Sequence, residues 1–226
     1  QFESLATQYA ASISLGVGQF CTNPGLLIVH AGPKLSAFLE ALTAHLEKVS
    51  PAAMLHRGIL ASYAKKVSAA LEQPGVTAII QNHPTDSDAK ALPILASVSA
   101  DEFLLNPHLK EEVFGPYSLV VVANDANQML AVLRSVTGQL TTSLMGTDID
   151  FKEYGSFIQD AMQVAGRVIC NGVPTGVEVC DAMVHGGPFP ATTDSRFTAV
   201  GVEAAKRWVR PVAFQNRSEE HTSELQ

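Results

Sequence analysis

The sequence has only three cysteines in 226 residues, Cys21, Cys170 and Cys180, and none of them forms a CxxC pair. This odd, widely spaced set fits neither a disulfide framework nor a zinc site, so we expect a reducing, cytoplasmic compartment and no bound metal. No signal peptide is recognisable, and no apolar run approaches the roughly 18 residues of a membrane-spanning helix, so no membrane partner is expected.

Positive charge is also scarce. Lys and Arg number 15 against 22 Asp and Glu, which gives a net charge of −7 at neutral pH. No basic run or basic–aromatic stripe offsets this balance, so nucleic acid is not an expected partner. The apolar fraction of 46% and the charged fraction of 16% are those of an ordinary soluble globular protein.

Hydrophobic periodicity predicts alternating strands and helices. Strands are expected over 26–31, 76–81, 92–98, 117–123, 140–146, 167–170 and 209–215, and helices over 2–13, 33–49, 55–72, 126–136, 151–164 and 198–208. The nearly continuous apolar run 117–123 is typical of a strand buried on both faces of a parallel sheet. The expected fold class is therefore α/β, with a doubly wound, mostly parallel sheet.

One cysteine lies in a segment that cannot be regular. Residues 16–25, here called the Cys21 loop, contain Cys21 together with three glycines and Pro24. Glycine permits unusual backbone angles, and proline fixes φ and keeps the residue before it out of the helical region. A thiol on such a loop can be a nucleophile, since thiolate is reactive and the loop's backbone N–H groups can stabilise an anion. It can equally be a small buried hydrophobe, and spacing alone leaves both interpretations open.

Two further irregular segments have polar residues of interest. Residues 111–116, the Glu112 loop, read Glu-Glu-Val-Phe-Gly-Pro, and a long Gly- and Pro-rich loop, 171–196, contains His185 between a valine and two glycines. His185 could orient a substrate or assist a thiolate, or be a solvated histidine, and the two glutamates could be an exposed acidic turn. Cys170 ends an apolar strand and is expected in the core, whereas Cys180 stays undecided.

The three loops together resemble the aldehyde dehydrogenase superfamily. The resemblance rests on Gly18-Gln-Phe-Cys21, Glu111-Glu-Val-Phe-Gly-Pro116, Asn171-Gly172 and His185-Gly-Gly187, in this order. The longer runs 19–25, 171–178 and 183–198 resemble its NADP-preferring branch, which oxidises 2,5-dioxovalerate (α-ketoglutarate semialdehyde). The resemblance covers residues 1–216.

The resemblance implies a role for each motif residue. Cys21 matches the nucleophile that attacks the aldehyde, and its backbone N–H would form half of the oxyanion hole. Glu112 matches the residue that holds the nicotinamide ribose, and Phe114 would pack near the nicotinamide ring. Phe20 and His185 would lie at the substrate pocket. The implied cofactor is NADP, with NAD left open, and the implied partners are a small aldehyde and further copies of the same chain.

The resemblance also predicts how the chain is divided. Residues 1–208 would be an N-terminally truncated catalytic domain, residues 209–216 an oligomerisation strand, and residues 217–226 an unstructured tail that resembles a translated sequencing adapter. The general-base glutamate, the oxyanion-hole asparagine and the Rossmann cofactor half would lie upstream, and no Gly-x-Gly-x-x-Gly occurs here. We therefore expect little or no turnover from these residues alone. Two rival hypotheses remain, a thiol hydrolase that uses Cys21 with His185 and a non-catalytic scaffold.

Overall fold

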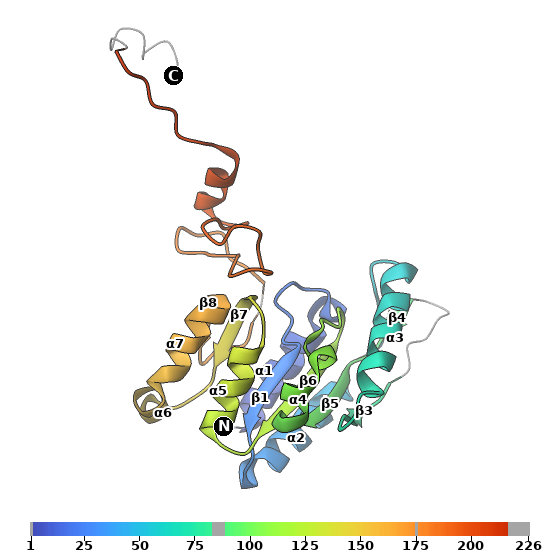
Figure 1. Ribbon diagram of the computed structural model, residues 1–226. Coiled ribbons are helices and arrows are strands. Elements are labelled where there is room, and N and C mark those ends of the chain that lie inside the picture. Colours follow the sequence, from blue (N-terminus) through green and yellow to red (C-terminus); the bar gives the residue numbers. More distant parts are fainter. Residues whose placement is uncertain (1, 83–88, 175, 217–226) are drawn as a thin grey trace.

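The computed structural model describes residues 2–82, 89–174 and 176–216 (Figure 1). The strands are β1 (Leu26–His30), β2 (Ala52–Ala53), β3 (Thr77–Ile80), β4 (Lys90–Ala91), β5 (Ile94–Ser99), β6 (Tyr117–Ala123), β7 (Gln139–Leu144) and β8 (Ala165–Cys170). The α-helices are α1 (Phe2–Ser14), α2 (Pro33–Leu46), α3 (Arg57–Leu71), α4 (Ala100–Leu105), α5 (Ala126–Ser135), α6 (Asp148–Glu153) and α7 (Gly155–Val164). Short 3₁₀ helices are η1 (Leu15–Gly18), η3 (Pro107–Lys110) and η4 (Val202–Trp208). The predicted tail, 217–226, lies outside the described residues.

A four-stranded sheet forms the centre of the molecule, in the order β1-β6-β5-β3. Strands β1 and β5 run parallel to β6, and β3 pairs with β5 in the antiparallel direction. Strands β7 and β8 form a separate parallel pair, and β2 and β4 a short antiparallel one. The expected α/β class with a mostly parallel sheet is confirmed.

Helices cover both faces of the four-stranded sheet, as a doubly wound fold requires. On one face Leu119 and Val121 of β6 belong to a core that includes Leu60 of α3 and Phe103 of α4. On the other face Val120 packs with side chains of α1 and α2. Because successive strand residues point to opposite faces, β6 is apolar at nearly every position, and it is buried at every position except Val122, which is half-buried.

Two helical segments differ from the prediction. Helix α4 follows directly on β5 without a loop, and the Oγ of Ser99 caps it by accepting from the Glu102 N–H at 3.2 Å. The single helix expected over 151–164 is instead broken at Tyr154, whose backbone angles are non-helical, into α6 and α7. Helix α6 begins three residues earlier than predicted, because Thr147 and Asp150 form a capping box there.

The C-terminal region is less regular than predicted. Of the helix expected over 198–208, only the 3₁₀ helix η4 forms. Residues 209–215 are in no strand pairing within the described part of the chain, and they lead away from the sheets in Figure 1. The prediction of a strand here is therefore wrong for the isolated chain, because no sheet edge lies beside it to supply hydrogen-bond partners.

Candidate active site

The Cys21 loop is a tight reversal between α1 and β1. Gly16, Val17 and Gly18 all have left-handed backbone angles, with φ between 56° and 65°. Hydrogen bonds from two side chains hold the loop in place. Asn23 Nδ2 donates to the Ile13 carbonyl at 2.9 Å, and Ser118 Oγ of β6, which is buried, donates to the Pro24 carbonyl at 2.6 Å. The reversal leaves Cys21 exposed at the carboxyl side of the helix. The irregular backbone predicted here is confirmed.

Backbone contact joins the Cys21 loop to the Glu112 loop. A Cβ placed on Gly18 would overlap the carbonyl group of Gly115, so only glycine permits this approach. Between the two loops lies a cavity of about 380 Å³, whose lining includes Phe20, Cys21, Glu112 and Phe114. The structure therefore brings four of the five predicted site residues around one cavity, although the two loops that carry them are about ninety positions apart in the sequence.

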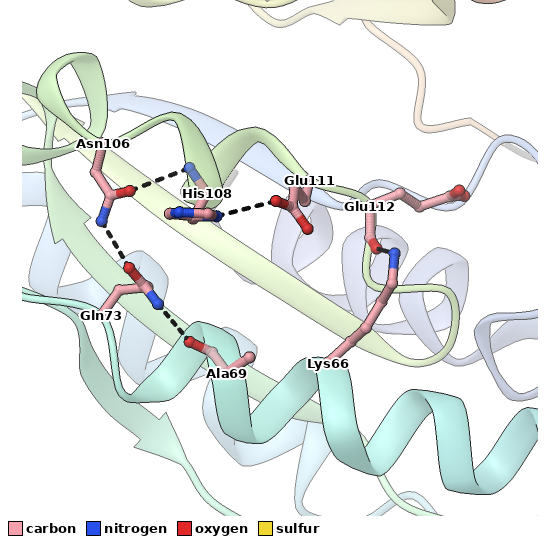
Figure 2. A network of polar contacts seen from close by, with 7 residues as sticks. All are labelled: Lys66, Ala69, Gln73, Asn106, His108, Glu111 and Glu112. Carbon is pink, nitrogen blue, oxygen red and sulfur yellow. Dashed lines mark hydrogen bonds and ion pairs between the residues drawn. The ribbon is translucent and has the colours of Figure 1, made fainter.

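The Glu112 loop is attached to helix α3 (Figure 2). Lys66 Nζ donates to the backbone carbonyl of Glu112 at 2.7 Å. The carboxylate of Glu112 points away from Lys66 in Figure 2, and the residue is exposed. His108 Nδ1 lies 3.0 Å from a carboxylate oxygen of Glu111. The two glutamates therefore differ: the Glu111 carboxylate is paired with His108 of η3, whereas the Glu112 carboxylate is available to a ligand.

A second set of polar contacts supports the start of this loop. Asn106 caps η3 by accepting from the His108 N–H at 3.0 Å, and its Nδ2 donates to Gln73 Oε1 at 2.9 Å (Figure 2). Asparagine before proline is a recognisable cap signal that the sequence interpretation did not use. Lys66 carries no such signal, because its partner lies 46 positions away in the sequence.

His185 makes direct contact with the nucleophile candidate. Its Nε2 lies 3.2 Å from Cys21 Sγ, and its backbone N–H donates to Thr198 Oγ1 at 2.8 Å. Burial lowers the pKa of His185 below its usual value, and the nearby guanidinium of Arg167 lowers it further. The imidazole is thus held in its neutral form at neutral pH. Of the two uses considered for His185, assistance to a thiol has a geometric basis.

Glycine contacts hold the His185 segment against β7 and β8. A Cβ on Gly166 of β8 would overlap the carbonyl of Gly186, and a Cβ on Gly187 would overlap the carbonyl of Gln139 in β7. The absence of a side chain at Gly166 and at Gly187 therefore permits the loop to lie directly on strand backbone. This close approach fixes the imidazole over the Cys21 loop.

The other two cysteines are both exposed, so the prediction that Cys170 is a core residue is wrong. Cys170 is the last residue of β8, and that strand pairs only with β7 among the described strands, so its end is not covered. No cluster of three or more His, Cys, Asp or Glu side chains suited to a metal ion occurs in the described ranges. None of the helices seen in this part of the chain is long and apolar enough to cross a membrane.

Comparison with known proteins identifies the superfamily. No protein-family model matches the chain. The chain is 41% identical over 220 residues to an α-ketoglutaric semialdehyde dehydrogenase of Acinetobacter baylyi, and 42% identical over 215 residues to α-ketoglutaric semialdehyde dehydrogenase 2 of Azospirillum brasilense. These matches cover 96% and 95% of this chain, and the chain spans 41% of the length of each relative.

Solved structures agree on the fold. Lactaldehyde dehydrogenase from Escherichia coli is similar with a TM-score of 0.75 at 16% identity, over 93% of this chain and 43% of that one. A 3,6-anhydro-L-galactose dehydrogenase is similar with a TM-score of 0.73 at 15% identity, over 93% and 44% of the two chains. The chain belongs to the aldehyde dehydrogenase superfamily. Within it, the chain matches the α-ketoglutaric semialdehyde dehydrogenases, and the branch that its motifs predict is confirmed.

Proposed function

We propose that this chain is the nucleophile-bearing part of an NADP-dependent dehydrogenase that oxidises 2,5-dioxovalerate to 2-oxoglutarate. The observation that carries the proposal is the cavity shared by the exposed Cys21 thiol, the Glu112 carboxylate and the Phe114 ring. The proposal takes its substrate from the two semialdehyde dehydrogenases that are similar over nearly the whole chain.

Cys21 performs the covalent step in this proposal. Its thiolate attacks the aldehyde carbon, a carbon–sulfur bond forms, and the carbonyl electron pair moves to oxygen. The backbone N–H of Cys21 donates to that oxyanion. Hydride loss from the same carbon then leaves a thioester on Cys21. Water cleaves the carbon–sulfur bond, which releases the carboxylic acid and the thiol.

Two residues on the far side of the cavity suit the nicotinamide end of NADP, which supplies the hydride acceptor when bound. The Glu112 carboxylate has free acceptor oxygens, which can receive the hydrogen bonds of two ribose hydroxyls. Phe114 is 37% exposed and presents an apolar surface to the cavity, against which a flat ring can pack. The Lys66 contact holds the backbone of Glu112 beside the cavity.

The rival thiol hydrolase needs an imidazolium. In that chemistry the histidine takes the thiol proton and then donates it to the leaving group. Burial and Arg167 both disfavour protonated His185. The close Cys21–His185 contact therefore does not favour proton transfer of the kind that a thiol hydrolase needs. Hydride loss needs no proton donor, and a neutral histidine is compatible with aldehyde oxidation.

The remaining part of each relative has no counterpart in this chain. The aldehyde dehydrogenase resemblance assigns the water-activating base to that part, and a general base contributes typically about 10²–10⁴-fold to a rate. We therefore expect the purified chain to oxidise 2,5-dioxovalerate slowly or not at all. Robust NADP-dependent oxidation by the purified chain would contradict this expectation.

A chimera tests the proposed function. Residues 2–216 would replace the matching segment of the Acinetobacter baylyi relative, and NADPH formation from 2,5-dioxovalerate would be followed by absorbance. We expect activity that is lost in C21A and kept in C170A, which removes another exposed thiol that does not line the cavity. The same assay with NAD measures cofactor preference. If the C21A chimera retains full activity, the assignment of the nucleophile is wrong.

We further propose that residues 1–208 form a catalytic domain, that residues 209–216 pair with a second copy of the chain, and that the protein is cytoplasmic. Val209 and Val212 are both more than half exposed, and a second copy of the chain would cover this apolar surface. Sedimentation of the chimera with and without residues 209–216 measures this contribution. An unchanged oligomeric state would refute it.

A further inference from the structure

The imidazole of His185 contacts Cys21 through one ring nitrogen, and the hydrogen bonding of its other nitrogen is unusual. While Nε2 lies 3.2 Å from Cys21 Sγ, Nδ1 is buried and has no hydrogen-bond partner among the described residues. A histidine that serves as a general base is normally oriented by an acceptor at its second nitrogen, which also stabilises the charged ring. His185 lacks that acceptor.

Three surroundings therefore oppose a positive charge on this ring. The ring is partly buried, and the positive charge of the Arg167 guanidinium on β8 acts on it, so both lower the pKa of His185. Protonation would also place an N–H on the buried Nδ1 with nothing to accept it. The neutral ring avoids this if its one proton is on Nε2, which then points at the cysteine sulfur.

We propose that His185 is a positioning residue that stays uncharged and donates its Nε2–H to the Cys21 thiolate. The hydrogen bond stabilises the anion and holds Sγ at the cavity. The thiol proton leaves to solvent water and does not pass to the imidazole, so no charge is created on the ring. This inference rests on the proposed role of Cys21 as nucleophile, but it makes its own claim about which group holds the proton.

The proposal is tested by alkylating Cys21. Since Cys170 and Cys180 are also exposed, the measurements use a C170S/C180S background in which Cys21 is the remaining thiol. Rates of reaction with iodoacetamide are recorded from roughly pH 5 to roughly pH 10, a range that brackets the titration of an ordinary thiol. The parent, H185F and H185Q are compared, and H30F serves as a control for removal of an exposed histidine on β1.

We expect the alkylation rate of the parent to rise with pH, and H185F to react more slowly than the parent. At pH 7 the loss of one hydrogen bond to a charged group should slow alkylation of H185F by about tenfold. H185Q should recover most of this rate, because its side-chain N–H can reach the position of Nε2, whereas H30F should match the parent. Unfolding midpoints of all variants, measured by circular dichroism, establish that each one is folded.

Two results would overturn the proposal. Equal rates for the parent and H185F across the whole range would show that the imidazole does not act on the sulfur. A rate that is already high near pH 5, together with ¹⁵N shifts of an imidazolium when Cys21 is ionised, would show that the proton moves to His185. The expected ¹⁵N spectrum is that of a neutral ring protonated at Nε2.

The chimera assay distinguishes this inference from the proposed function. If alkylation depends on His185 but the C21A chimera still oxidises aldehyde, the function is wrong and the contact stands. If C21A abolishes activity but the rate of alkylation does not depend on His185, the proposed function stands and the positioning role of His185 is wrong.

Discussion

Substitution of Gly18 by alanine is expected to destabilise the chain and to disturb the cavity at the same time. Gly18 has φ of 65°, and a Cβ there would overlap the Gly115 carbonyl and the Pro116 nitrogen. The left-handed backbone costs a non-glycine residue about 1–2 kcal/mol. Overpacking adds about 1–3 kcal/mol, because the neighbouring atoms are backbone and cannot rotate away. We therefore expect G18A to lose roughly 2–5 kcal/mol of unfolding free energy.

The matched control is G25A in the same loop. Gly25 has no positive φ, and a Cβ there would meet nothing within 4 Å, so G25A is expected to be neutral or stabilised by up to about 1 kcal/mol. Urea unfolding of both variants, followed by circular dichroism, gives the two free energies. Cys21 alkylation at neutral pH then reports whether the loop has moved. If G18A and G25A have the same stability, the backbone contact between the two loops does not exist in solution.

Three smaller predictions follow from the hydrogen bonds of individual side chains. The single O–H of Tyr63 is shared between two carbonyl oxygens, each 3.3 Å away, so Y63F should lose about 1 kcal/mol of stability in urea unfolding. The buried Tyr117 hydroxyl has no partner among the described residues, so Y117F should be neutral or stabilised by up to about 1 kcal/mol in the same assay. S118A removes the buried donor to the Cys21 loop and should cost about 1–2 kcal/mol in the same assay; no loss would mean that the loop is held by other contacts. Hydrogen bonds from the side chain and the backbone N–H of Arg196 lower the pKa of Asp194 to about 2, so this carboxylate contributes stability above about pH 4 that is lost as the pH falls toward 2. A carboxyl NMR titration should place its midpoint near 2, and in R196Q the midpoint should rise only part of the way to the ordinary value of about 4, because the backbone N–H still donates.

The central part of the fold was predictable because local pattern and burial agree there. The run 117–123 is apolar on both faces, and β6 occupies those positions with neighbours on both sides. The Cys21 loop was predictable for a similar reason, since its glycines and Pro24 restrict the backbone regardless of what surrounds it. Its grouping with Glu112 and Phe114 came from motif resemblance, because no local property of either loop indicates the other.

Features that depend on distant neighbours could not be predicted. The apolar strand that ends in Cys170 predicts a core residue, but burial of a strand end depends on what covers it, and Cys170 is exposed. Helix α4 was missed because six residues between a strand and an Asn-Pro pair are too few to show a helical period. The contact of His185 with Cys21 joins residues 164 positions apart, and neither residue type identifies the other as its partner.

The position of His185 has a mechanical consequence. The Cys21 loop is attached to the four-stranded sheet through β1 and β6, whereas the His185 segment lies on the β7–β8 pair, and the described residues show no strand pairing between the two sheets. A small sliding of one sheet past the other therefore changes the distance between sulfur and imidazole before it changes either loop. The chemistry of the thiol is in this way coupled to the alignment of the two sheets.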